Sequence, residues 1–110
     1  MIKRVSLVWK RPELSNLEFR KLWLGEHAEY AKRLPGLREY LIDFVTEGPE
    51  EGPSGLATLR FDSREALEVA FSDPDLGHEL LRTRERFARA VQVMIVDEQA
   101  VVPRVALESK

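Results

Sequence analysis

The sequence predicts an α+β fold whose elements follow the order β-α-β-β-α-β. Four short runs rich in β-branched and apolar residues indicate strands, and two segments with apolar residues at helical spacing indicate helices. Pro, Gly, Ser and Asp residues separate these segments. The order is that of the ferredoxin-like arrangement, in which both helices cover one face of a four-stranded antiparallel sheet. With 110 residues, the chain is expected to form one domain over residues 1–102, followed by a tail over 103–110.

The first strand and the first helix have the clearest boundaries. The strand is expected over residues 2–10, a run of mostly apolar and β-branched side chains. Ser15 and Glu18 form a capping-box pattern, which satisfies free N–H groups at a helix start, so a helix is expected over residues 16–33. A Pro-Gly pair then ends this helix. One stripe at helical spacing carries its apolar and aromatic residues: Phe19, Leu22, Trp23, Tyr30 and Leu34.

Turn and capping residues divide the second half of the chain into two strands, a helix and a last strand. Asp62 or Ser63 is expected to cap the helix, with Glu65 available to complete a capping box on Asp62. The sequence SDPDLG, residues 72–77, breaks the helix, which resumes over residues 76–90. Strands are expected over three runs: 37–47, 56–61 and 91–102.

The composition describes a folded globular protein and excludes several functional classes. Apolar residues make up 44% of the chain and charged residues 33%. The net charge is -2, with Lys and Arg scattered among Glu, so no nucleic-acid partner is expected. The absence of cysteine excludes disulfides, thiol nucleophiles and Cys-ligated metals, and a cytoplasmic location is expected. The apolar run near the N-terminus is too short for a signal peptide or a membrane span, so no membrane partner is expected.

The first and last strands predict a homodimer. Both are apolar on their two faces, at least over residues 2–10 and the first half of 91–102. The helices can cover only one face of the sheet, and the other would leave a large apolar patch in water. A second copy of the sheet packed against the first, at a spacing of roughly 10 Å, is the simplest cover for that face.

A combination of motifs extends over residues 2–102 of the chain. Its parts are Lys10-Arg11, Leu14-Ser15, Phe19, Trp23, Glu26-His27-Ala28, Leu34-Pro35-Gly36-Leu37-Arg38, Tyr40 and the run from Gly55 to Ser63. This combination resembles the EthD family of dimeric α+β barrel proteins. The chain departs from the family pattern at Arg60, where many relatives carry a bulky aromatic residue. A pocket at that point would be more polar and more positive.

The resemblance implies a small apolar or aromatic ligand, bound in a cleft between the sheet and the helices of each subunit. The wider dimeric barrel superfamily includes small cofactor-free monooxygenases, polyketide cyclases, muconolactone isomerases and haem-handling enzymes. The resemblance does not supply one reaction, because fold and function are only loosely coupled.

His27 is the leading catalytic candidate. It lies one turn after Trp23, at the flank of the aromatic stripe. A neutral imidazole that faces an apolar cleft would be a plausible general base near neutral pH, and Tyr40 or Arg60 would steady the resulting oxyanion. In the alternative interpretation, His27 only ties the first helix to the sheet or to the partner subunit. Arg60 could hold a carboxylate or an enolate if it points into the cleft, and it is a surface or interface charge if it points outward. The same two possibilities hold for Arg4.

Aromatic side chains are the candidates for ligand binding: Trp9, Trp23, Tyr30 and Phe61. Such residues serve equally well as ordinary core, where a buried Tyr hydroxyl needs a hydrogen-bond partner. His78 is expected to face solvent on its helix. No metal site is predicted, because the two histidines lie far apart and no carboxylates occur at ligand spacing.

The leading hypothesis is an EthD-like small-molecule-binding protein that uses no cofactor. It would act as a cofactor-independent oxygenase, cyclase or isomerase on an apolar or aromatic oxygenated substrate, with His27 as general base. Two alternatives stay open. One is a non-catalytic module for ligand binding or dimeric interaction, and the other is a haem-binding protein with His27 as the axial ligand.

Overall fold

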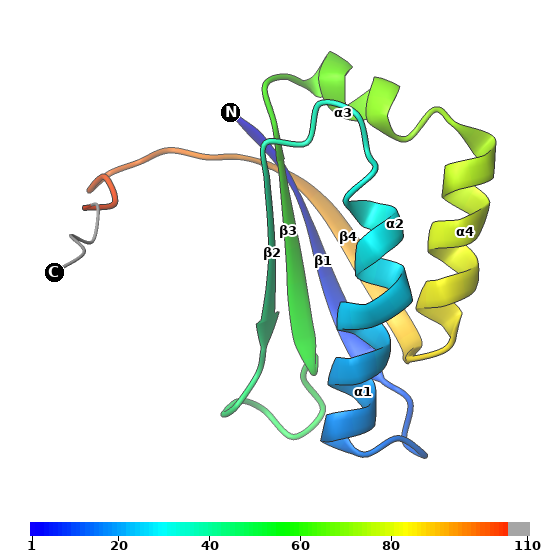
Figure 1. The fold of residues 1–110 in the computed structure, drawn as a ribbon. Coiled ribbons are helices and arrows are strands. Elements are labelled where there is room, and N and C mark those ends of the chain that lie inside the picture. Colours follow the sequence, from blue (N-terminus) through cyan, green and yellow to red (C-terminus); the bar gives the residue numbers. More distant parts are fainter. Residues whose placement is uncertain (106–110) are drawn as a thin grey trace, which may run out of the picture.

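In the computed structural model, which describes residues 1–105, four antiparallel strands form one sheet and the helices lie on one of its faces (Figure 1). The strand order across the sheet is β2-β3-β1-β4, which confirms the predicted α+β, ferredoxin-like fold. Residues 106–110 of the expected tail lie outside the described residues. The elements are β1 (Ile2–Lys10), α1 (Asn16–Leu22), the π-helical turn η1 (Trp23–His27), α2 (Ala28–Ala31), β2 (Glu39–Phe44), β3 (Gly55–Phe61), α3 (Arg64–Ala70), α4 (Pro74–Glu85) and β4 (Ala88–Asp97).

The first helical segment has the predicted start but is not the single helix that the apolar stripe predicts. The Ser15 hydroxyl accepts a hydrogen bond from the Glu18 N–H at 3.1 Å, and the Glu18 carboxylate accepts one from the Ser15 N–H at 2.9 Å. At η1 the Ala28 N–H donates to the Trp23 carbonyl, which widens the turn to a π-helical one. Helix α2 then ends at Ala31, before residue 33.

Two strand starts differ by a few residues from the prediction. β2 begins at Glu39 rather than at residue 37, because Gly36 adopts a positive φ of 76° and the Leu37 N–H bonds back to the Leu34 carbonyl. The turn keeps the chain out of the sheet over these residues. β3 begins at Gly55, one residue before the expected 56–61.

α3 begins after one of its two expected caps, whereas α4 and β4 both begin earlier than expected. Ser63, not Asp62, caps α3, since its hydroxyl accepts a hydrogen bond from the Ala66 N–H at 3.1 Å. Asp73 caps α4, and a proline at the first helical position suits that start. The Phe87 carbonyl accepts a hydrogen bond from the Arg11 N–H at 2.9 Å, which draws the chain toward the sheet directly after α4. β4 therefore starts at Ala88, within the segment predicted as helix.

The two faces of the sheet follow from the pairing register. One row across the strands contains Tyr40, Leu59, Arg4 and Ile95, and it lies on the helical face. The adjacent row lies on the opposite face, which no helix within residues 1–105 covers (Figure 1). We call this opposite side the open face. Its central residues are Val5, Leu7, Leu41, Leu56, Thr58 and Met94.

An aromatic cluster forms the core between the sheet and the helices. Trp23 stacks on Phe87, with ring centroids 5.3 Å apart, and meets Phe19 and Phe44 edge-on. Gly55 makes room for the indole, because a Cβ at this position would lie 2.6 Å from the Trp23 Cζ3 atom. The glycine at the start of β3 therefore sets how closely η1 approaches the sheet.

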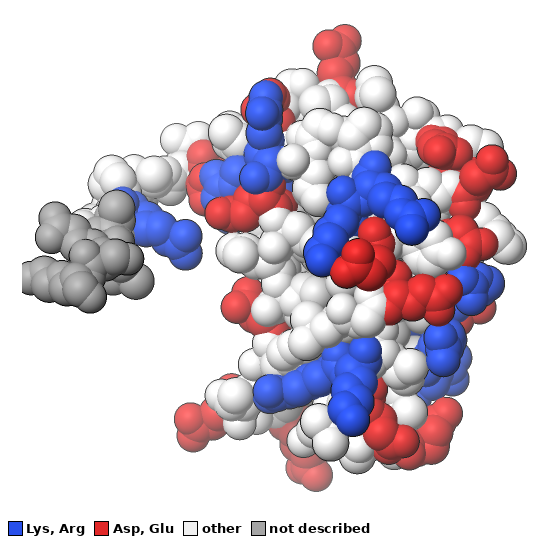
Figure 2. Space-filling view, viewed as in Figure 1, with Lys and Arg blue, Asp and Glu red and all other residues white. Residues whose placement is uncertain are grey.

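The surface that Figure 2 shows carries acidic and basic side chains interspersed with one another and with uncharged residues. This mixed pattern is typical of a protein surface that meets water. Within residues 1–105, no helix combines the length and the apolar character that a membrane span requires.

Candidate functional site

A cavity of about 140 Å³ lies between the sheet, the η1–α2 segment and α4. Apolar side chains form most of its wall. An engineered apolar cavity of similar volume holds one benzene ring, so the space suits a ligand body of about that size. The apolar lining comes from both layers and includes Leu59 and Val91 of the sheet and Ala31, Leu34, Leu80 and Phe87 of the helical layer.

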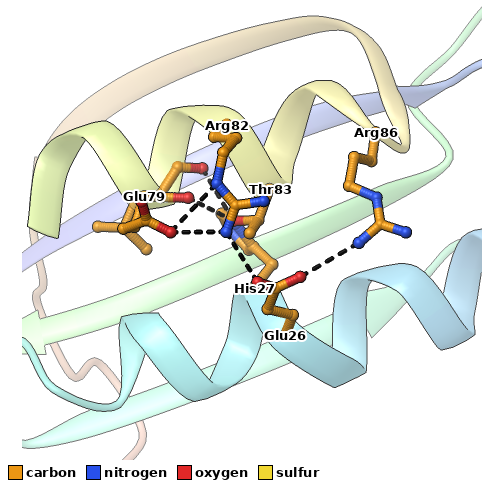
Figure 3. Close-up of polar contacts among 7 residues, drawn as sticks. Glu26, His27, Glu79, Arg82, Thr83 and Arg86 are labelled. Carbon is orange, nitrogen blue, oxygen red and sulfur yellow. Dashed lines mark hydrogen bonds and ion pairs between the residues drawn. The ribbon is translucent and has the colours of Figure 1, made fainter.

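His27 lines the cavity and is held by α4 (Figure 3). Its Nδ1 atom lies 2.7 Å from the Thr83 hydroxyl oxygen. That hydroxyl donates its single hydrogen to the Glu79 carbonyl at 2.8 Å, so its oxygen accepts from the ring. The bonding pattern thus assigns the proton of the neutral imidazole to Nδ1. The Nε2 atom keeps its lone pair.

The environment of His27 favours the neutral ring. Burial lowers the pKa of His27 from 6.5 to about 4, and the positive charges of Arg84 and Arg4 act in the same direction. A hydrogen bond to the Leu80 carbonyl opposes this shift. The imidazole is therefore uncharged at neutral pH, and it is a weaker base than its reference pKa predicts.

Tyr40 lies across the cavity from the helices, on the row of Leu59 and Arg4. Burial raises the pKa of its hydroxyl to about 12, while a hydrogen bond with Trp23 acts in the opposite direction. The phenol therefore keeps its proton at neutral pH. It is available as a hydrogen-bond donor and not as a base.

Ion pairs close the gap between η1 and α4 outside the His27–Thr83 contact (Figure 3). The Glu26 carboxylate lies 2.7 Å from an Arg82 nitrogen and 3.1 Å from an Arg86 nitrogen. Arg82 also pairs with Glu79. These groups are about half exposed, so each pair contributes little to stability, but together they hold the two helices in register.

Arg60 does not line the cavity, so its expected role there does not fit, and the alternative of a surface or interface charge does. Arg60 lies on the open face of β3, where its guanidinium pairs with Glu39 at 3.3 Å and also binds the Glu98 carboxylate. Hydrogen bonds from Arg60 and Lys3 lower the pKa of Glu98 to about 2. Side chains alternate along a strand, so Arg60 must point away from the face that Leu59 occupies.

The four candidate aromatic residues divide between different places. Only Trp23 lines the cavity. Trp9 lies on the open face, where its indole N–H donates to the Glu51 carbonyl at 3.0 Å. Tyr30 borders a separate shallow groove on the outer side of α2 and α4, and Phe61 is fully buried in the core, edge-on to Phe71. Residues Trp9, Tyr30 and Phe61 therefore do not line the cavity.

Sequence reasoning missed Arg84 and Thr83 and left Arg4 undecided, although all three face the region around His27. Helical spacing could have indicated Arg84, because it follows Leu80 by four residues and precedes Phe87 by three and so shares their face of the helix. Its place in a run of charged residues points instead to a solvated helix face. Alternation along β1 could have placed Arg4 on the helical face of the sheet, because that is the face of the core residue Val8.

The family comparison matches residues 11–90 of the chain to the EthD domain. The chain belongs to the EthD family. The match covers η1 with His27, the whole of β3 and α4, and therefore most of the cavity wall. No curated protein sequence gives a significant match to this EthD domain.

Solved structures share the fold of this EthD domain at low sequence identity. An ethyl tert-butyl ether D (EthD) family protein from Bacillus halodurans matches with a TM-score of 0.74 and 22% identity, over 90% of this chain and 100% of that chain. SnoaB, a cofactor-independent oxygenase from Streptomyces nogalater, matches with a TM-score of 0.67 and 12% identity, over 94% and 97%. A dimeric protein of unknown function and ferredoxin-like fold from Bacteroides fragilis matches with a TM-score of 0.65 and 10% identity, over 88% and 95%.

Proposed function

We propose that this EthD domain binds a small apolar or aromatic molecule in the cavity beside His27 and transfers a proton to or from it. The reaction would be of the cofactor-independent oxygenase, cyclase or isomerase type, each of which can begin with removal of a proton from a carbon acid or a phenol. A single observation carries the proposal. The neutral His27 ring, with Nδ1 bound to Thr83 and Nε2 unprotonated, lines a cavity the size of one aromatic ring.

The remaining polar groups of the cavity suit such a step. The Nε2 lone pair takes the proton, and the electron pair of the broken bond moves onto the substrate oxygen. Tyr40 keeps its proton at neutral pH and is available to donate a hydrogen bond to that oxygen. The resemblance in fold to a cofactor-independent oxygenase agrees with the proposal but does not identify the reaction.

Hydrogen exchange in a probe ligand tests the proton transfer without knowledge of the natural substrate. Phenylacetone combines one ring with an acidic C–H bond, and deuterium uptake from D2O at its benzylic carbon is followed by NMR. The wild-type protein is expected to accelerate the uptake, and His27→Gln to lose roughly a hundredfold of that acceleration. His78→Gln is the matched control, since His78 lies exposed on α4. Equal uptake with wild-type and His27→Gln proteins would sink the catalytic role.

Ligand binding without catalysis is the second candidate function. The observation that favours it is the lowered pKa of His27, about 4, which makes the ring a weak base. In this case the His27→Gln protein would still bind phenylacetone, and neither protein would exchange its protons. The haem-binding alternative fits the site poorly, because a cavity of about 140 Å³ holds one ring and not a porphyrin.

We also infer that two copies of the chain pack through the open face. Several apolar side chains on this face are substantially exposed in the single chain, among them Leu41 at 40% and Met94 at 41%. Leu41 and Met94 lie in one row across the sheet, with Thr58 and Val5 between them. The fold match to a dimeric ferredoxin-like protein supports a second copy of the chain as the partner.

A further inference from the structure

Two arginine side chains reach the cavity of the EthD domain from opposite layers. Arg4 lies on β1 in the sheet and Arg84 lies on α4, and both line the cavity with His27. The Arg4 guanidinium lies over the Phe71 ring, 4.7 Å from its centroid, and donates one hydrogen bond to the Ser6 hydroxyl at 3.1 Å. A stacked aromatic ring and a hydroxyl orient this guanidinium but leave its charge uncompensated.

No carboxylate balances these two charges within residues 1–105. Neither guanidinium forms an ion pair in this part of the chain, and the cavity wall holds no acidic residue. Two acidic side chains close to His27 and Thr83 are already paired: Glu26 binds Arg82 and Arg86, and Glu79 binds Arg82 (Figure 3).

The positive charges of Arg4 and Arg84 also repel one another. Burial lowers the pKa of Arg4, and the charge of Arg84 lowers it further. Two like charges held near a low-dielectric space raise the free energy of the empty site, and an anion bound between them would remove that cost. The site is therefore electrostatically incomplete as it stands.

We propose that the ligand of this cavity is a carboxylate on a body of about one ring, with its carboxylate held between Arg4 and Arg84. This assignment rests on the proposed small-molecule function of the cavity and specifies its ligand class. A planar carboxylate matches the donor fork of a guanidinium and can accept two parallel hydrogen bonds from it. The apolar wall, which includes Leu59, Leu80 and Phe87, then holds the ring beside His27.

A pair of matched fluorinated probes tests the assignment on the full chain. Ionised 4-fluorobenzoate and neutral 4-fluorobenzamide have the same ring and nearly the same shape, and fluorine NMR titrations at pH 7 measure the affinity of each. The benzoate is expected to bind at least about tenfold more tightly, since charge-assisted bonds to two guanidinium groups are available only to the anion.

Substitution of single arginines then shows which guanidinium groups bind the benzoate carboxylate. Arg84→Gln and Arg4→Gln are each expected to weaken benzoate binding by about tenfold or more and to leave benzamide binding nearly unchanged. Arg86→Gln is the matched control, because it removes the same charge two positions from Arg84 but outside the cavity. Thermal unfolding of each variant establishes that it is folded, and Arg84 is the safer site because it lies on a partly exposed helix face.

The outcomes separate the ligand class from the function of the cavity. Benzamide binding as tight as benzoate binding, or equal losses in Arg84→Gln and Arg86→Gln, would overturn the carboxylate assignment while the cavity remained a small-molecule site. A Val91→Phe variant, which narrows the cavity, should weaken both probes. If neither probe binds the wild-type protein, both the carboxylate assignment and the proposed binding of one-ring ligands are overturned.

Discussion

At the scale of single residues, Thr83 determines what the His27 ring can do. The Thr83 side chain is almost fully buried and donates its only hydrogen to the backbone of its own helix. His27 must then donate from Nδ1, which leaves Nε2 as the one ring nitrogen with a lone pair. A hydroxyl on α4 thus orients an imidazole that belongs to the first helical segment, and neither residue alone defines the site.

The buried neutral state of His27 predicts a dependence of stability on pH. The unfolded chain binds a proton on His27 near pH 6.5, whereas the folded protein does so only near pH 4. Between these values the unfolded state holds more protons, so stability falls as the pH is lowered through this window. The shift corresponds to at most about 3 kcal/mol of unfolding free energy.

Urea unfolding of wild-type and His27→Gln proteins at a series of pH values measures this contribution. The unfolding free energy of the wild-type protein is expected to fall relative to that of His27→Gln from pH 7 to pH 4, because only the wild-type chain carries the titrating ring. The variant corrects for the carboxylates that also titrate in acid. Parallel curves for the two proteins would show that His27 is not held in the neutral state.

At the scale of elements, the contact between Trp23 and Gly55 sets the spacing of the helical layer above the sheet. The indole edge lies directly against the Gly55 backbone, where any side chain would collide with it. The π-helical turn η1 begins at Trp23 and ends at His27, so the same turn that seats the indole also presents the imidazole to the cavity. Such wide turns are frequently found at functional sites.

A pair of glycine substitutions tests this contact. Gly55→Ala is expected to destabilise the protein by roughly 1–3 kcal/mol, since its Cβ would lie 2.6 Å from Trp23 Cζ3 and 3.1 Å from the Asp43 carbonyl. Gly77→Ala in α4 meets nothing within 4 Å and is expected to stabilise the protein by up to about 1 kcal/mol. Thermal or urea unfolding gives both values. Equal effects of the two changes would contradict the close packing of Trp23.

Sequence patterns located the elements better than their ends. The capping box of Ser15 and Glu18 gave the start of α1, because this motif is local and needs no distant partner. The start of β4 was placed too late, since Ala88 joins the sheet through pairing with Lys10, a residue far away in the chain. Such pairing leaves no local mark in the sequence around Ala88.

At the scale of the whole molecule, the two faces of the sheet differ in what covers them. The helices cover the other face and leave Val5, Leu7 and Met94 toward the outside. Near one end of the open face, Arg60, Glu39 and their neighbours form an ion-pair network. In a dimer through this face, the apolar centre would be buried, and the charged end would help to fix how the two sheets are oriented.

A single charge on the open face should separate the two copies. Met94→Glu replaces a side chain that is 41% exposed in the single chain, so the fold tolerates it while the apposed sheets do not. Light scattering at micromolar concentration is expected to give a dimer for the wild-type protein and a monomer for this variant. Val69→Glu on α3, where Val69 is 63% exposed, is the control and should stay dimeric. A wild-type monomer, or a dimeric Met94→Glu protein, would exclude this interface.

The sequence by itself determined the order of strands and helices, the placement of Trp23 in the core and the choice of His27 as the leading polar candidate. These features follow from local spacing, from caps and from chain-breaking residues. Alternation could also have placed Arg60 on the face away from Leu59 and Phe61, since the flanking apolar residues recur at every second position.

Only the tertiary structure decided which arginines meet the cavity and which nitrogen of His27 is free. Arg84 stands among several similar charged residues, and the packing of α4 against η1 is what turns it inward. Thr83 reaches His27 across 56 residues of sequence, a distance that no local pattern spans. The physical reason is common to both. The chemistry of the site depends on side chains from separate layers, and their meeting is fixed by how the layers pack.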